Sequence, residues 1–269
     1  MAGRPASRRE TKGEPQPHDV SARMIPRYSD AGFMIVLPGD DPRETVDAIL
    51  ETGYGQEFCV SPSFDPDFVA GLMEAGFLVM SAMFAGSGKA GDGGFYVALP
   101  KLHLVRSVLF FDDLHVKKST RRLLGRYELY HDRDFDFILN RCVEVHGDGW
   151  LTPPLVAAIA EIRRRGLRGV RPTSFSLYRD GRPVAGEFGV SVGGVYTSYS
   201  GYYDETGAGT VQLVLATRWL RDNGFAFFDL GMPLDYKSDL GAVEVGPREF
   251  VGIFRSAQNG FVRQPDRTL

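Results

Sequence analysis

Three extended segments in close succession constrain the fold of this chain more than any other feature. They cover residues 174–178, 183–191 and 195–200, and two short turns that contain glycine separate them. Segments rich in aromatic and β-branched side chains with such turns between them are typical of an antiparallel meander. The sequence therefore predicts a sheet with an antiparallel centre.

A helix and one more strand follow the meander, at residues 210–222 and 225–230. Gly207 and Gly209 precede the helix, so bare N–H groups could face an anion or an ester oxygen, although an ordinary strand-to-helix turn has the same pattern. Asp229 lies near the end of the strand, where a carboxylate either faces a cleft or caps a neighbouring loop. The loop and the strand end are the first candidate site.

Composition divides the chain into three parts. Residues 1–27 are polar and rich in arginine, proline, serine and glutamate, which predicts a disordered tail. Residues 28–105 are predicted to form a small α/β domain, with helices that begin after the capping residues Asp41 and Asp65. Residues 106–269 contain the meander and are predicted to form a larger α+β domain.

Bulk properties exclude several classes of protein. The 269 residues are 43% hydrophobic and 24% charged, which is typical of a globular protein, and no apolar run is long enough to span a bilayer. The net charge of -3 does not suggest a protein that coats nucleic acid. Cys59 and Cys142 have no C-x-x-C spacing and the histidines have no metal-ligand spacing. We therefore expect a cytoplasmic protein without a metal site.

Several segments invite comparison with phosphate-binding elements. Residues 86–89 lack the first glycine and the hydroxyl residue of a phosphate loop, so we expect a mobile loop there. A helix through residues 115–126 would gather four cations on one face, and these are Lys117, Lys118, Arg121 and Arg122. Such a face can bind phosphates or can simply be solvated. The arginines at 163–165 close a helix, where the helix dipole favours cations without any partner.

Residues from about 95 to 254 resemble the leucyl/phenylalanyl-tRNA:protein transferase family. The resemblance is carried by residues 115–124, 127–135, 149–151, 182–189 and 240–248, and by Asp229. It implies an N-acetyltransferase-like fold, with a mixed, mostly antiparallel sheet flanked by helices. Family members move leucine, phenylalanine or methionine from aminoacyl-tRNA to the N-terminal amine of a protein that begins with Arg or Lys. Aminolysis of this activated ester needs no metal, cofactor or covalent intermediate.

The same resemblance implies roles for individual residues. Asp229 would be the carboxylate of the proton network, and the four cations between residues 115 and 126 would contact acceptor-stem phosphates. Trp150 with Phe95 or Tyr96 would border the terminal adenosine, and Tyr202 with Phe228 would border an apolar pocket. The expected partners are aminoacyl-tRNA and the N-terminus of an acceptor protein or peptide, with the chain acting as a monomer and without a membrane.

The chain departs from the family pattern at polar positions. Tyr199 replaces an active-site glutamate, Gly231 replaces a glutamine, and Ser176 replaces another glutamate. These changes leave open a non-catalytic relative that keeps a tRNA or peptide groove. They also leave open an acyl-CoA-dependent N-acyltransferase, because residues 204–209 mimic a pyrophosphate loop, although Asp204 would repel a pyrophosphate.

Overall fold

The computed structural model describes residues 25–84 and 93–258. Within them, seven strands form one sheet in the order β11-β5-β10-β9-β8-β7-β6. The strands are β5 (Arg106–Phe110), β6 (Glu128–His131), β7 (Arg171–Arg179), β8 (Arg182–Val192), β9 (Val195–Tyr203), β10 (Phe227–Gly231) and β11 (Val243–Val245). Every neighbouring pair is antiparallel except β9 and β10. The predicted meander and the mixed, mostly antiparallel class are confirmed.

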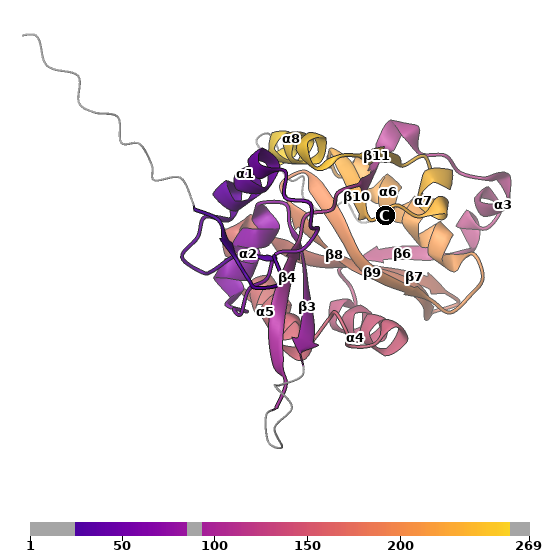
Figure 1. Cartoon of the computed structure of the whole chain (residues 1–269). Coiled ribbons are helices and arrows are strands. Elements are labelled where there is room, and N and C mark those ends of the chain that lie inside the picture. The colour runs from indigo at the N-terminus through magenta and orange to yellow at the C-terminus, as the bar shows by residue number, and fades with distance from the viewer. Residues whose placement is uncertain (1–24, 85–92, 259–269) are drawn as a thin grey trace, which may run out of the picture.

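Helices cover both faces of this sheet (Figure 1). On one face, α4 (Phe135–His146) and α5 (Pro153–Arg165) share an apolar cluster with Phe188 and Val190 of β8. On the other face, α6 (Ala208–Asp222) packs on Phe175, Tyr196 and Phe228. Successive side chains of a strand point to opposite faces, so each strand supplies both clusters. None of the helices in the described ranges is long and apolar enough to cross a membrane.

The first part of the chain adds two small sheets and two helices. The elements are β1 (Arg27–Tyr28), β2 (Met34–Ile35), α1 (Pro42–Thr52), α2 (Pro66–Glu74), β3 (Leu78–Phe84) and β4 (Phe95–Lys101). The Asp41 carboxylate accepts from the Arg43 N–H, and the Asp65 carboxylate accepts from the Phe68 N–H. Both predicted caps are therefore present. The predicted tail falls almost wholly, and the 86–89 loop wholly, outside the described residues.

The predicted helix through residues 115–126 is wrong in extent. A single turn, α3 (Lys118–Arg121), is followed by the 3-10 turn η2 (Leu124–Arg126). The His115 N–H bonds to the Leu240 carbonyl 2.9 Å away, which fixes the start of the segment in an extended conformation. Tertiary contact therefore limits the helical pattern here.

Three elements near the end of the chain and two connecting turns have no counterpart in the sequence prediction. They are η1 (Phe111–Asp113), η3 (Leu167–Gly169), α7 (Asp235–Asp239), β11 and α8 (Pro247–Gln258). Phe250 and Phe254 of α8 are buried in the same cluster as Leu72 and Met73 of α2. The apolar core thus runs without interruption across the boundary proposed near residue 105.

The junction of β9 and β10 gives the sheet one open end. The two strands pair in parallel only from Val195 to Thr197 of β9, and β10 ends at Gly231 while β9 continues to Tyr203. The β8–β9 pairing also shifts here, because Ser198 and Ser200 lie opposite consecutive residues of β8. The extra residue between them is Tyr199, as in a β-bulge. Among the described residues, the last part of β9 therefore has no strand partner on its β10 side.

Candidate active site at the open end of the sheet

The Asp229 carboxylate is fully buried and has every oxygen bonded. It lies 2.9 Å from the Arg106 guanidinium, and it accepts hydrogen bonds from the Thr197 hydroxyl at 2.8 Å and the Gly231 N–H at 3.0 Å. Of the two alternatives that the sequence left open, the structure shows a carboxylate that caps the following loop. The side chain does not face a cleft.

Arg106 connects this carboxylate to the first part of the chain. Its Nη1 donates to the Gly76 carbonyl at 2.9 Å, and its guanidinium lies 3.9 Å from the centre of the Phe250 ring. A buried charge pair of this kind is costly to break, because removal of one partner leaves the other uncompensated. Arg106 and Asp229 therefore hold β5, β10 and the end of α2 in one arrangement.

Tyr199 lies next to the same network. Its hydroxyl oxygen accepts a hydrogen bond from the Val79 N–H at 3.0 Å, which attaches β3 to the large sheet. Burial raises the Tyr199 pKa, and the nearby Asp229 charge raises it further. The structure thus brings together three predicted site residues, Asp229, Tyr199 and Gly231, and gives Tyr199 a tethering contact.

A second polar network lies on the opposite face, between β8, β9 and α6. The Ser198 hydroxyl donates to Glu187 at 2.8 Å, and Glu187 is only 2% exposed. Burial raises the Glu187 pKa to about 7, although the hydrogen bond from Ser198 and the charge of Lys237 oppose this rise. A carboxyl group with a pKa near neutrality is suited to proton transfer.

Lys237 closes this network from α7. Its ammonium donates to the carbonyls of Leu230 at 2.5 Å and Met232 at 2.8 Å, just where β10 ends. Burial lowers the Lys237 pKa to about 8, while Asp229 and Glu187 raise it. Sequence analysis did not identify Glu187 or Lys237. The available signal for Glu187 was a single carboxylate within an apolar strand.

The four predicted phosphate-binding cations are all exposed beside this end of the sheet. Lys117 pairs with Asp239 of α7 at 2.5 Å, and the Arg121 guanidinium donates to the Val116 carbonyl at 3.0 Å. Lys118 and Arg122 have no side-chain partner in the part of the chain that the structure describes. Lys117 thus contacts the same short helix, α7, that carries Lys237.

The loop before α6 has its own internal contacts. Asp204 pairs with Arg141 at 2.9 Å, and the Ala208 N–H bonds to the Glu205 carbonyl at 3.1 Å. Gly207 adopts a positive φ of 84° at the helix start. These bonds are those of a strand-to-helix turn, which was one of the two predicted alternatives.

The remaining predicted site residues are dispersed. Trp150 is half-buried, and its carbonyl accepts from the Ser81 N–H and hydroxyl at 2.9 and 2.8 Å. Tyr96 is 37% exposed on β4. Tyr202 packs on Phe137 of α4, whereas Phe228 packs on Tyr196 beneath α6. Tyr202 and Phe228 therefore lie on opposite faces, and the structure does not bring them together in one pocket.

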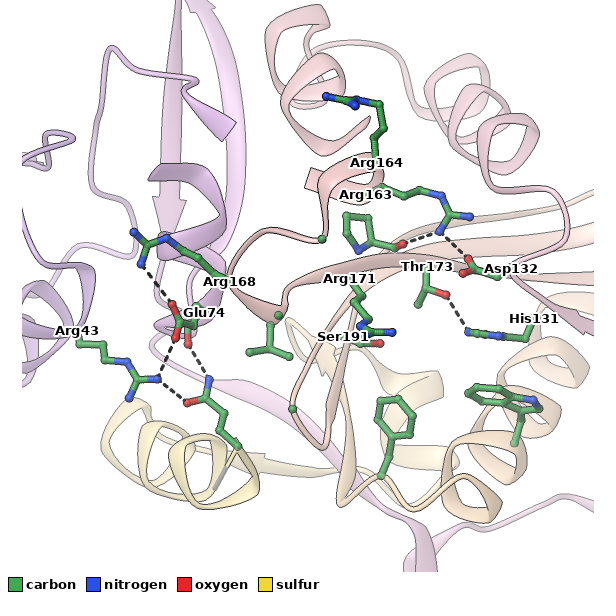
Figure 2. A pocket seen from close by; sticks show the side chains of 18 residues that line it. Arg43, Glu74, His131, Asp132, Arg163, Arg164, Arg168, Arg171, Thr173 and Ser191 are labelled. Atoms are coloured by element: carbon green, nitrogen blue, oxygen red, sulfur yellow. Dashed lines mark hydrogen bonds and ion pairs between the residues drawn. The ribbon is translucent and has the colours of Figure 1, made fainter. Parts of the chain in front are cut away.

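A cavity of about 920 Å³ lies at the other end of the sheet (Figure 2). Its lining includes Gly193 in the β8–β9 turn and Phe225 just before β10, so it is separated from the open end by the length of these strands. Arg163 and Arg164, to which the sequence gave little functional weight, are part of its wall.

The fold defines an α+β protein, with a mixed, mostly antiparallel sheet that helices cover on both faces. A family model described as "Leucyl/phenylalanyl-tRNA protein transferase" matches residues 108–255, and the chain belongs to this family of transferases. A solved structure of FemX is similar with a TM-score of 0.42 and 10% identity, covering 80% of this chain and 78% of that one.

Curated relatives carry the same description, "Leucyl/phenylalanyl-tRNA--protein transferase". One from Rubrobacter xylanophilus is 31% identical over 63% of this chain and 85% of its own length. One from Pseudomonas putida is 33% identical over 54% of this chain, and the match spans 65% of that relative. One from Rhizorhabdus wittichii is 28% identical over 71% of this chain and 74% of its own length.

Proposed function

We propose that the chain transfers an amino acid of the leucine, phenylalanine or methionine type from aminoacyl-tRNA to the N-terminal amine of a protein or peptide. The observation that carries this proposal is the family match over residues 108–255, which spans the open end and its flanking cations. In the reaction, the amine nitrogen bonds to the ester carbonyl carbon. The bond from that carbon to the ribose oxygen breaks, and the ribose hydroxyl leaves with a proton.

The reaction requires a group that takes a proton from the attacking amine. The pair formed by Ser198 and Glu187 supports this role, because Ser198 is half-buried at the open end and donates to a carboxyl group with a pKa of about 7. Ser198 would take the amine proton and give its own hydroxyl proton to the ionised Glu187 carboxylate, which would then protonate the leaving ribose oxygen.

The enclosed Asp229 carboxylate is suited to a positioning role. Through the Gly231 N–H it fixes the end of β10, and through Arg106 it fixes the neighbouring strand. Pre-organisation of this kind lowers a barrier by holding the reacting groups in place. Trp150 and Tyr96 remain proposed contacts of the terminal adenosine.

We assign the phosphate contacts to the cations at and next to α3. Lys118 and Arg122 are exposed and have no partner among the described side chains. They can therefore bind RNA phosphates without first breaking an ion pair, and the RNA releases its counterions. We also propose that the chain works as a monomer in the cytoplasm, where the buried thiols of Cys59 and Cys142 would stay reduced.

A transfer assay tests the proposal. Purified protein is incubated with tRNA charged with labelled leucine, phenylalanine or methionine and with a peptide that begins with Arg or Lys. We expect label on the peptide, and none on the same peptide with an acetylated N-terminus. Label on neither peptide, from any of the three charged tRNAs, would contradict the proposal.

A non-catalytic relative is the second candidate function. The observation that favours it is Tyr199, whose hydroxyl is engaged with β3 at the position of a family glutamate. Binding of charged tRNA without any transfer would support this candidate. Thermal stabilisation by coenzyme A and not by aminoacyl-tRNA would instead support an acyl-CoA-dependent enzyme.

A further inference from the structure

Five arginines from four separate elements line the cavity at the β8–β9 turn (Figure 2). They are Arg43 of α1, Arg163 and Arg164 of α5, Arg168 of η3 and Arg171 of β7. A helix dipole explains cations in the last turn of α5, but it does not explain cations that arrive from α1 and β7. This grouping is therefore a property of the tertiary structure.

The carboxylates in the lining do not balance these cations. Arg43 and Arg168 share Glu74 at 3.4 and 3.6 Å, and Arg163 pairs with Asp132 at 2.9 Å. Outside the lining, Asp67 pairs with Arg168 and Glu161 pairs with Arg164. Arg171 is exposed, and its guanidinium has no partner in the described ranges. The cavity thus keeps a positive surplus with five N–H donors free on Arg171.

Backbone conformation at the cavity is also unusual. Among the described residues, Asp132, Arg168 and Asp180 are the non-glycine residues with a positive φ. Two of these three, Asp132 at 60° and Arg168 at 52°, line the cavity. Residues held in sparsely populated conformations are concentrated at ligand sites, where the surrounding structure sets their side chains.

We propose that this cavity binds clustered phosphate groups and that, in the transfer reaction, it holds a stretch of the tRNA backbone remote from the aminoacyl end. The first part rests on the cavity alone, and the second part rests on the proposed function. Guanidinium groups match phosphate oxygens through paired N–H donors, which favours arginine at such sites. The nine residues of β9 separate the two ends of the sheet by about 30 Å, a span that an extended polyanion such as tRNA can bridge.

Binding of deacylated tRNA tests the proposal without any turnover. Fluorescence anisotropy with labelled tRNA is measured over a salt series for the wild type and for an Arg164→Ala/Arg171→Ala variant. Both side chains are exposed, and neither crosses to another element, so the variant should fold. We expect roughly tenfold weaker binding and a salt slope lower by about 2.

The control is Arg248→Ala, which removes one exposed arginine at the far end of α8 from the cavity residue Gln258. Its guanidinium donates to the Leu50 carbonyl. The control should bind tRNA as the wild type does. A loss that is as large per charge removed as in the double variant would reduce the effect to net charge and overturn the proposal.

A second experiment distinguishes the source of the phosphates. It measures how far inorganic tripolyphosphate raises the unfolding temperature of the protein. Tripolyphosphate could stabilise the wild type but not the double variant, while both bind tRNA equally well. This result would assign the cavity to a free polyphosphate and overturn the tRNA part. If neither tRNA nor tripolyphosphate distinguishes the double variant from the wild type, the whole proposal is overturned. These readouts are independent of whether amino acid transfer occurs.

Discussion

Arg106 and Asp229 form an ion pair at 2.9 Å with side-chain exposures of 2% and 0%. This pair joins the neighbouring strands β5 and β10, and through the Gly76 carbonyl it reaches the end of α2. The family carboxylate is therefore as much a part of the core as of the candidate site.

Replacement of Asp229 by Asn should destabilise the protein by about 3–5 kcal/mol, because the buried Arg106 charge loses its partner. The free energy of unfolding in urea measures this effect. Asp239→Asn, which removes a carboxylate from the exposed pair with Lys117, is the control and should change stability by less than about 1 kcal/mol. Equal effects of the two substitutions would contradict the importance of the buried pair.

Tyr199→Phe should cost about 1–3 kcal/mol, because the buried Val79 N–H loses its acceptor. Tyr199→Glu, which restores the family residue, should cost more, since it places a second carboxylate near Asp229. Thermal unfolding compares the two variants, and Tyr203→Phe on the 67% exposed side chain of the same strand is the control. A Glu variant as stable as the wild type would show that the tether is dispensable.

The raised pKa of Glu187 predicts a pH dependence of stability. The unfolded carboxyl group loses its proton near its ordinary pKa of 4.5, whereas the folded one keeps it up to about 7. The stabilisation by this group is therefore complete below pH 4.5 and is lost as the pH rises to 7, by roughly 3 kcal/mol.

Glu187→Gln tests this dependence, because the amide does not titrate. The variant should gain stability relative to the wild type between pH 5 and pH 8, as measured by urea unfolding at both values. Lys237 has a pKa lowered to about 8 and titrates mainly above this window. A difference between variant and wild type that stays constant with pH would argue against a buried, titrating Glu187.

Lys118→Ala/Arg122→Ala should weaken tRNA binding and lower its salt slope by about 2, because two phosphate contacts are lost. The structure selects these two cations since Lys117 and Arg121 already have protein partners. The matched control is Lys118→Arg/Arg122→Lys, which keeps both charges and should bind normally. Unchanged affinity in the alanine variant would remove the segment from the proposed RNA surface.

Local sequence predicted those elements whose signals are local. The caps at Asp41 and Asp65 and the turns of the meander depend on a few neighbouring residues, and all of them are present in the structure. The prediction of a long helix at residues 115–126 was wrong because the His115 N–H bonds to Leu240, more than a hundred residues away. Its helical pattern gave no sign of that contact.

The sequence by itself determined the class of fold, the family blocks and the four cations beside the candidate site. Each of these features depends on residues that are adjacent or regularly spaced in the sequence. Only the tertiary structure decided that Asp229 faces Arg106, that Ser198 meets Glu187, and that arginines from four elements surround one cavity. Burial and pairing arise where distant segments meet. The types of the side chains alone do not specify these long-range contacts.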